Sequence, residues 1–280
     1  MNIQELLNQG SKELNLNNIK THILDSEILL SKILNKSREK ILLNPKQEVK
    51  FEDTIKFKKL IKRRSLNEPV AYILNEKEFW SLNFYVNKST LIPRPETELM
   101  VDKLTKIFKD KAINILDIGT GSGCILLSLL LELKNSSGLG IDISRDSVKI
   151  AAYNAKAHNL NNRAKFLRMC FSNFYQKKFD LIVSNPPYVK RSVIKNLDGG
   201  IKLFEPKIAL DGGNDGLDLI RKVIYKAKYI LKIKGLLSLE IGNEQLKEVS
   251  KILKRNNLRV EHIVSDYKDN VRSIISRLIL

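Results

Sequence analysis

The stretch ILDIGTGSGCILLSLL, residues 115–130, decides the fold. It begins with apolar residues typical of a buried strand, continues with Gly119, Gly121 and Gly123, and runs into apolar residues that predict a helix over Ser122–Leu133. Glycines at such a turn let the backbone approach a ligand, and the first N–H groups of the helix are free to bind one. The stretch therefore predicts a strand–turn–helix unit that holds a cofactor.

Strand and helix patterns alternate over the rest of the C-terminal part. Such alternation indicates an α/β fold with a doubly wound, mostly parallel sheet of seven strands and helices on both faces. The last two strands, joined by the polar loop 265–270, are expected to form an antiparallel hairpin. The expected strands are Ile113–Ile118, Gly138–Ile141, Ala164–Leu167, Phe179–Val183, Leu236–Ile241, Arg259–Val264 and Val271–Arg277, and the further helices are Asp146–His158, Asp215–Leu231 and Glu244–Lys254.

The part of the chain before this core divides into two segments. Apolar residues at helical spacing predict a small N-terminal helical domain over residues 1–68. Residues 69–92, rich in aromatic and β-branched side chains, predict a β-hairpin linker with its turn at Asn75–Lys77. The catalytic domain is then expected at 93–280, and Pro95 and Glu96 suit the first turn of its first helix.

An acidic residue strengthens the cofactor prediction. Asp142 ends the second strand about 20 residues beyond the glycines, where it can accept hydrogen bonds from both hydroxyls of a ribose. A turn residue or a helix cap is the alternative. The glycine pattern G-x-G-x-G follows Asp117 and lacks the later third glycine of a dinucleotide motif, which favours a cofactor with one nucleoside.

The segment LIVSNPPYVK, residues 181–190, places unusual chemistry after a buried strand. Two prolines cannot continue a strand, because they lack the N–H donor. The side-chain oxygen of Asn185 and the carbonyl of Pro186 can accept both hydrogens of a planar NH2 group, Pro187 stiffens that carbonyl, and an exposed Tyr188 can pack on the flat face of the substrate. We interpret the motif as a site that binds a planar NH2 group and positions its nitrogen for reaction; the alternative is a proline-rich turn that ends a strand.

The glycine loop resembles that of doubly wound AdoMet-dependent methyltransferases. This resemblance implies S-adenosyl-L-methionine as the cofactor, with its ribose on Asp142 and its methionine part on the glycine loop, Gly119, Thr120, Gly121, Ser122 and Gly123. Motifs along most of the chain resemble, more specifically, the peptide-chain release factor glutamine methyltransferases. These motifs are DSEILL (25–30), RRSLNEPVAYIL (63–74), EFWSLNF (78–84), TLIPRPETELMV (90–101), NPPY (185–188) and EPKIALDGGNDGLDLIRKVI (205–224).

The family resemblance implies a specific reaction and a specific site. A methyl group passes from S-adenosyl-L-methionine to the side-chain amide nitrogen of the glutamine in the Gly-Gly-Gln motif of peptide-chain release factors, while the N-terminal domain helps to dock the factor. Asn185, Pro186, Pro187 and Tyr188 would be catalytic and hold the glutamine amide, with Asn185 also near the methionine end of the cofactor. Arg94 and Glu96 would border the substrate, with an ordinary helix start as the alternative. Glu205–Pro206 and the loop 212–216 would wall the site.

Two regions depart from the family pattern. Asn67 and Asn75 stand where glycine is usual, and Asn tolerates left-handed backbone better than other residues with a side chain. Met169 and Cys170 stand where the family has an acidic and then an apolar or aromatic residue around the adenine. Cys170 and Phe171 are therefore expected to contact the adenine, with Phe171 supplying the ring.

Composition limits the remaining alternatives. The 280 residues hold two cysteines and three scattered histidines, too few for a disulfide framework or a metal site, and neither a signal peptide nor a membrane span is expected. The chain is thus expected in the cytoplasm. The net charge of +18 fits either contact with ribosome or RNA through a basic surface, or compositional drift toward lysine. Two other functions stay open, methylation of an adenine or guanine amino group in RNA or DNA, and non-catalytic RNA binding on a decayed methyltransferase fold.

Overall fold

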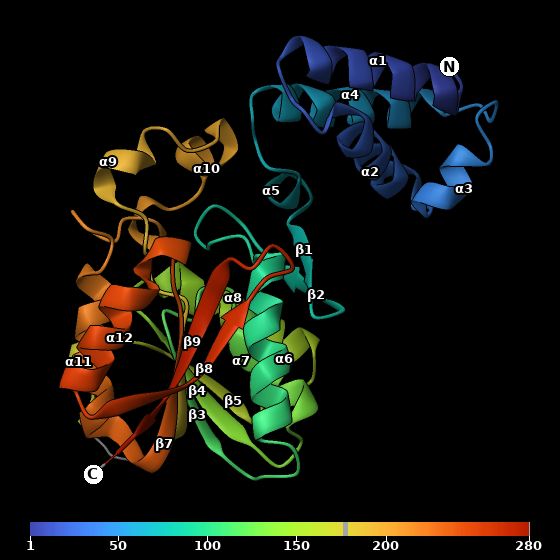
Figure 1. The fold of residues 1–280 in the computed structure, drawn as a ribbon. Coiled ribbons are helices and arrows are strands. Elements are labelled where there is room, and N and C mark those ends of the chain that lie inside the picture. The colour runs from blue at the N-terminus through green and yellow to red at the C-terminus, as the bar shows by residue number, and fades with distance from the viewer. Residues whose placement is uncertain (176–178, 280) are drawn as a thin grey trace. The chain divides into compact units, whose positions relative to one another are not determined.

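The computed structural model describes residues 1–175 and 179–279. The chain divides into two compact units. One unit contains Met1–Asn75 together with Asp198–Phe204, and the other contains Glu76–Leu197 and Glu205–Leu280. The first unit is helical, and the second contains both β-sheets (Figure 1).

Apolar residues at helical spacing form the core of the helical unit, as predicted. On its first helix Ile3, Leu6 and Leu14 are buried, and Asn2 caps that helix by accepting a hydrogen bond from the backbone N–H of Glu5 at 2.9 Å. Figure 1 shows the helices of residues 1–74 in blue to teal and the helix of residues 199–204 in gold. The unit contains α1 (Ile3–Leu16), α2 (His22–Leu34), α3 (Arg38–Leu42), α4 (Phe51–Ser65), α5 (Val70–Leu74) and α10 (Gly199–Phe204).

The predicted hairpin exists, but its turn was placed wrongly. Residues Val70–Leu74 form α5, and Asn75 ends that helix in the left-handed conformation, with φ 55°. The strands are β1 (Glu76–Phe79) and β2 (Leu82–Tyr85), and they turn at Trp80 and Ser81. Both turn residues have positive φ, 53° and 55°, as a two-residue turn that matches the strand twist requires. Sequence reasoning missed the turn because neither residue is glycine, asparagine or aspartate.

A buried side chain is one of the links between the hairpin and the rest of the second unit. Asn154, fully buried on α8 (Arg145–Ala157), accepts a hydrogen bond from the backbone N–H of Tyr85 at 2.8 Å and donates one to the Tyr85 carbonyl at 3.0 Å. A third bond runs from its amide to the carbonyl of Ser122, at 2.9 Å. One amide therefore joins the hairpin to the glycine loop.

Seven strands of the described residues form one sheet, in the order β5-β4-β3-β6-β7-β9-β8. The first five in this order are parallel, and β9 is antiparallel to both of its neighbours. This arrangement confirms the predicted fold class, including the terminal antiparallel hairpin. The strands are β3 (Asn114–Ile118), β4 (Ser137–Asp142), β5 (Ala164–Arg168), β6 (Phe179–Ser184), β7 (Leu231–Glu240), β8 (Leu258–Ser265) and β9 (Val271–Leu278).

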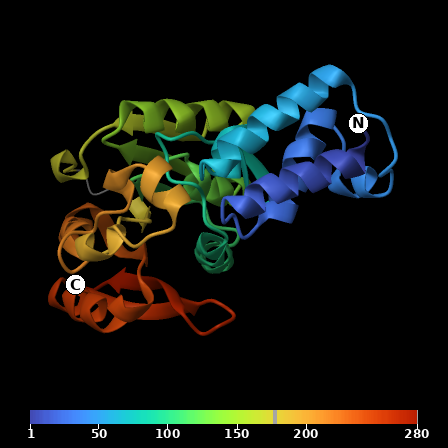
Figure 2. The same cartoon turned by 90° about the horizontal axis from the view of Figure 1, so that it is seen from above.

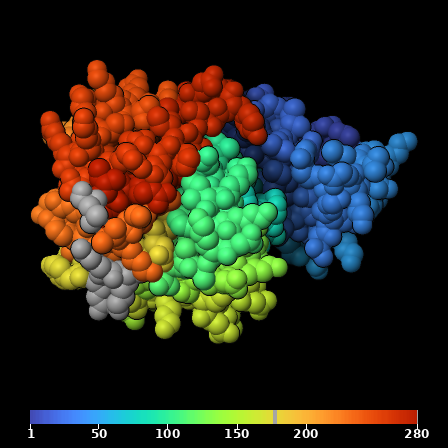
Figure 3. All heavy atoms as spheres, turned by 60° about the horizontal axis from the view of Figure 1, so that its bottom comes forward, coloured from blue at the N-terminus to red at the C-terminus, as the bar shows by residue number. Residues whose placement is uncertain are grey.

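Helices pack on the sheet and enclose its core. Figure 1 shows α6 (Glu98–Ile107) and α7 (Cys124–Glu132) on one side, and α11 (Asp218–Ile230) and α12 (Leu246–Arg255) on the other. Strands β5 and β8 are the two edges, and in Figure 2 the C-terminal hairpin lies in red along one side of this unit. Helix α6 packs on β8 and β9, and its green atoms border the red atoms of the hairpin in Figure 3.

Element boundaries differ from the prediction most clearly at the starts of α11 and β7. Helix α11 begins at Asp218 instead of Asp215, because Gly213 and Gly216 adopt positive φ, 89° and 80°, in the loop before it. Strand β7 begins at Leu231 instead of Leu236. Sequence reasoning also missed two short helices after the NPPY motif, α9 (Arg191–Ile194) and α10.

The topology places the two sequence motifs side by side. The chain moves from β3 outward to β4 and β5, then returns to β6 on the other side of β3. Ligands of open α/β sheets bind at the carboxyl ends of the strands where the order reverses in this way. Here that point lies between β3, which ends in the glycine loop, and β6, which ends in NPPY.

Candidate active site

A cavity of about 1340 Å³ opens at the carboxyl ends of β3, β4 and β6. Most of the residues predicted to bind cofactor or substrate line it. The described lining leaves out four of them, Thr120, Gly123, Tyr188 and Glu96. The predicted residues on its wall are Arg94, Gly119, Gly121, Ser122, Asp142, Cys170, Phe171, Asn185, Pro186 and Pro187.

The glycine loop owes its shape to backbone conformation. Gly119, Gly121 and Gly123 all have positive φ, at 73°, 55° and 81°, which side chains other than glycine rarely tolerate. No atom lies within 4 Å of where a Cβ of Gly119 would be. At Gly123 a Cβ would approach that of Ala151 to 3.2 Å, because α8 packs closely against the start of α7. The loop thus borders open space at Gly119, after β3, and is closely packed against α8 at Gly123, where α7 begins.

Asp142 is tied to the glycine loop. Its carboxylate accepts one hydrogen bond from the backbone N–H of Gly121 at 3.0 Å and another from Ser144 at 2.9 Å. A carboxylate has about four acceptor positions, so two remain for the hydroxyls of a ribose. The turn role that we considered as an alternative therefore coexists with the predicted ribose role.

Asp117 is a second carboxyl below this loop. It is buried at the end of β3 and accepts a hydrogen bond from the hydroxyl of Thr120 at 2.7 Å. The pKa of Asp117 is raised to about 7, mainly because the carboxyl is buried; the Thr120 hydrogen bond opposes this rise, and the nearby charge of Asp142 adds to it. Thr120 thus ties the glycine loop to a buried carboxyl by a hydrogen bond.

The NPPY loop differs in one respect from the prediction. Asn185 and Pro187 are half-buried on the cavity wall and Pro186 is buried there. Tyr188, predicted to be exposed, is half-buried and packs on the core, because its hydroxyl turns inward to a carboxylate. Gln245 holds the loop from behind by donating to the Tyr188 carbonyl at 3.1 Å.

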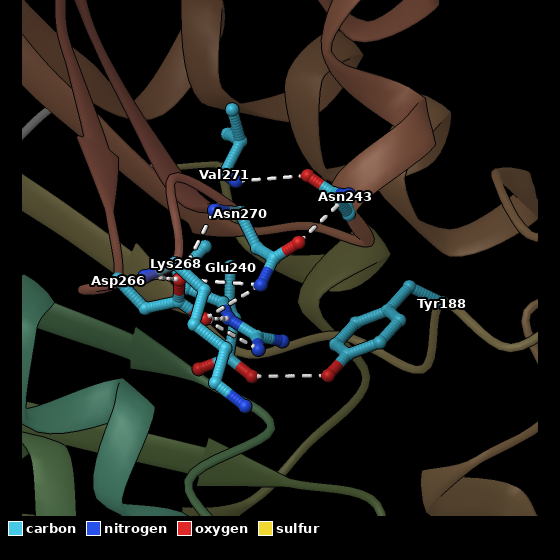
Figure 4. Close-up of polar contacts among 8 residues, drawn as sticks. Tyr188, Glu240, Asn243, Asp266, Lys268, Asn270 and Val271 are labelled. Carbon is cyan, nitrogen blue, oxygen red and sulfur yellow. Dashed lines mark hydrogen bonds and ion pairs between the residues drawn. The ribbon is translucent and has the colours of Figure 1, made fainter.

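That carboxylate belongs to Glu240, which sequence reasoning missed. Glu240 ends β7, next to β6, and is only 4% exposed. It accepts hydrogen bonds from the hydroxyls of Thr97, at 2.5 Å, and Tyr188, at 3.3 Å. Figure 4 shows the bond from Tyr188. Burial raises the pKa of Glu240, while hydrogen bonds from Thr97, Tyr188 and Asn185 lower it. The sequence shows only that Glu240 lies near the end of the predicted strand Leu236–Ile241, which does not mark it as a site residue.

Arg94 is held at the cavity wall by another buried acid. Its guanidinium donates to Glu205 at 2.6 Å, and the second oxygen of Glu205 accepts the backbone N–H of Ile92 at 3.3 Å. The carboxyl side chain of Glu205 is 1% exposed. Pro206 lines the cavity, whereas the loop 212–216 is not part of its described lining.

The end of the cavity near β5 contains a lysine that sequence reasoning did not single out. Met169, Cys170 and Phe171 line this end, and Cys170 and Phe171 are the two residues predicted to contact the adenine. Lys226 of α11 donates to the Ser172 carbonyl at 2.8 Å. Hydrogen bonding by Ser172 lowers the pKa of Cys170. This end of the cavity therefore combines a lysine with the side chains of Met169, Cys170 and Phe171.

Two properties of the described residues bear on the function classes. Their His, Cys, Asp and Glu side chains form no group of three that could hold a metal ion. Every helix that the structure describes is too short or too polar to cross a membrane.

Comparisons with known proteins identify the family of the chain. The PrmC N-terminal domain matches residues 5–74 and the methyltransferase small domain matches residues 95–199. A release factor glutamine methyltransferase of Fusobacterium nucleatum is 36% identical over 98% of this chain and 78% of its own, and one of Caulobacter vibrioides is 36% identical over 90% and 88%. A bifunctional methyltransferase of Rickettsia typhi is 38% identical over 97% of this chain but 56% of its own, so the chain spans little more than half of that protein.

Solved structures share the fold at low sequence identity. The catalytic domain of hMettl16, solved with an RNA hairpin of the MAT2A 3′UTR, aligns with a TM-score of 0.60 and 16% identity, over 79% of this chain and 82% of that one. A methyltransferase from Pyrococcus furiosus aligns with a TM-score of 0.54 and 17% identity, over 78% and 98%. At this identity the likeness concerns the fold alone.

The methyltransferase fold and family imply S-adenosyl-L-methionine as the methyl donor. The cavity fits such a molecule, because its wall combines the open space at Gly119, the carboxylate of Asp142 and the apolar side chains near β5. The motifs, the fold and the relatives that match nearly the whole chain together lead to one assignment: the chain belongs to the release factor glutamine methyltransferase family.

Proposed function

We propose that this chain transfers a methyl group from S-adenosyl-L-methionine to the side-chain amide nitrogen of the glutamine in the Gly-Gly-Gln motif of peptide-chain release factors. One observation carries the proposal: the Asn185–Pro187 segment and the glycine loop lie on one cavity wall, at neighbouring strand ends. The curated relatives that match nearly the whole chain support the same reaction.

The cofactor would rest on the β3 and β4 side of the cavity. Gly119 and Gly121 would face its methionine part, Asp142 would accept the ribose hydroxyls, and Cys170 and Phe171 would contact the adenine. When bound there, the cofactor supplies an electrophilic methyl group on a sulfonium. Asn185 lies on the side of this arrangement from which a substrate nitrogen would approach.

The chain's own contribution is to orient a weak nucleophile. The lone pair of an amide nitrogen is delocalised, so attack requires both N–H bonds to be held in place. The Asn185 side-chain oxygen and the Pro186 carbonyl are two acceptors for these bonds, and both strengthen as the nitrogen becomes positive in the transition state. No strong base is required, because the proton becomes acidic only after the methyl group has arrived.

The helical domain, residues 1–68, would dock the release factor through α4. An exposed face of this helix carries Phe51, Ile55, Lys59 and Lys62. The exposed fractions are 78% for Phe51 and 39% for Ile55, and the core lies on the opposite face. Apolar side chains among lysines suit an acidic protein surface, and the same face is where ribosome or RNA contact would occur. The substrate places the reaction in the cytoplasm.

The test is methyl transfer from labelled S-adenosyl-L-methionine to a purified release factor. We expect label on the wild-type factor and none on its Gln→Ala variant at the Gly-Gly-Gln motif. Label that persists on the variant would overturn the proposal. Faster transfer to RNA or DNA would favour the base-methylating alternative, which the relatives do not support.

A further inference from the structure

Glu240 is a buried carboxylate that the proposed reaction does not use directly. It is 4% exposed and absent from the described cavity wall. Isolating a carboxylate in this way is costly unless hydrogen bonds compensate it.

Two of these partners come from segments that form the site. The hydroxyl of Tyr188, in the NPPY motif, donates to one carboxylate oxygen at 3.3 Å, and that of Thr97, on the cavity wall, donates to the other at 2.5 Å. Figure 4 shows the Tyr188 ring pointing toward Glu240. An ionised carboxylate can only accept hydrogen bonds, so each group that hydrogen-bonds to Glu240 must present a donor to it.

Asn185 is the third partner. Strands β6 and β7 are parallel with Ser184 opposite Leu239, so the next residues along, Asn185 and Glu240, are neighbours. The Asn185 amide lies close enough to Glu240 to oppose the rise in the pKa of that carboxyl that burial causes. An amide has one end that donates and one that accepts. If NH2 faces the carboxylate, the oxygen must face the other way.

We propose that Glu240 is a positioning residue, which binds the NH2 group of Asn185 and thereby turns the Asn185 oxygen toward the cavity. The inference rests on the proposed function, because that oxygen is the acceptor for the substrate amide. Without Glu240 the Asn185 amide would be free to flip, and half of its orientations would present a donor to the substrate's N–H bonds. Thr97 and Tyr188 hold the carboxylate itself.

Nuclear magnetic resonance tests the inference without any substrate. In protein labelled with ¹⁵N-asparagine, the NH2 pair of Asn185 is identified by its loss in Asn185→Ala. We expect this pair to exchange slowly with solvent in the wild type and to shift in Glu240→Gln. Glu261→Gln is the matched control, since Glu261 is a partly buried acid of β8 that pairs with Arg277 at 2.6 Å. An unprotected wild-type pair, or one that does not shift in Glu240→Gln, would overturn the inference.

Kinetics with a release factor supply the second readout. Glu240→Gln should lower kcat about ten- to hundredfold, the loss expected for a misplaced polar contact, and leave KM for S-adenosyl-L-methionine within about threefold. In an Asn185→Ala background, Glu240→Gln should lower kcat little further, because both substitutions remove the same interaction. If the losses in kcat of the two single variants simply added in the double variant, the proposed coupling between Glu240 and Asn185 would be contradicted. A wild type that leaves the release factor unmethylated would refute the proposed function instead, while the spectra still decide the role of Glu240.

Discussion

The hydroxyl of Ser184 donates a hydrogen bond to the carbonyl oxygen of Ile118, 2.7 Å away. Both residues are the last of their strands, β6 and β3, and both are buried. The glycine loop begins one residue after Ile118 and NPPY one residue after Ser184. This single bond therefore links the two motifs at their bases.

Removing that bond should loosen both motifs. Ser184→Ala leaves the Ile118 carbonyl without its side-chain donor, and we expect the free energy of unfolding to fall by about 1–2 kcal/mol. Affinity for the cofactor should fall as well, as calorimetry can measure. Ser238→Ala on β7 is the matched control, because this buried hydroxyl has no hydrogen-bond partner among the described residues. Equal losses in both variants would contradict the role of the Ser184 bond.

Replacing Asn185 should separate rate from cofactor binding. Asn185→Ala removes an acceptor for the substrate amide, so we expect a loss of about 3 kcal/mol of transition-state stabilisation, roughly a hundredfold in rate. Cofactor affinity should fall less, because the glycine loop and Asp142 remain. Single-turnover assays and calorimetry measure the two effects, and unchanged turnover would contradict the acceptor role.

The buried carboxyl of Asp117 should make stability depend on pH. Its pKa is raised from 3.8 to about 7, so the folded chain holds this proton more tightly than the unfolded chain does. The contribution of Asp117 to stability is therefore greatest below pH 4 and declines as the pH rises to 7. Asp117→Asn removes the decline while keeping an acceptor for Thr120.

We expect Asp117→Asn to raise the melting temperature at pH 8 by about 4 °C, as 1–2 kcal/mol would in a domain of this size, and by less at pH 5. Scanning calorimetry at both pH values measures the difference. Asp146→Asn on α8, whose side chain is 66% exposed, should change the melting temperature little at either pH. A gain that is the same at pH 5 and pH 8 would exclude the titration of Asp117 as its source.

Charge on the exposed face of α4 should affect substrate binding alone. Replacing both Lys59 and Lys62 by Glu should raise KM for the release factor about tenfold at low salt, less at high salt, and leave kcat unchanged. Lys165→Glu on the edge strand β5 keeps the fold and serves as the control for a change in net charge. A double variant with unchanged KM would move the docking surface elsewhere.

Sequence reasoning succeeded where local pattern and tertiary structure agree. The strand before Gly119, the helix after it and the acid at Asp142 are each encoded by neighbouring residues, and alternation along the chain then determines the sheet. The turn at Trp80 and Ser81 was missed because its positive φ values are imposed on residues that do not prefer them.

The missed parts of the site come from residues that are distant in sequence. Glu240 and Tyr188 are separated by 52 residues, and Lys226 lies 54 residues from Ser172. Nothing in the segment around Glu240 distinguishes it from an ordinary strand end. Only the register between β6 and β7 brings it beside Asn185, and that register requires the folded sheet.

The Asn154 amide has a practical consequence for dividing the chain. Any fragment that started at residue 93 would lack Tyr85, and the fully buried side chain would lose two of its three bonds. A separately expressed catalytic half should start no later than Glu76, so that the hairpin travels with it.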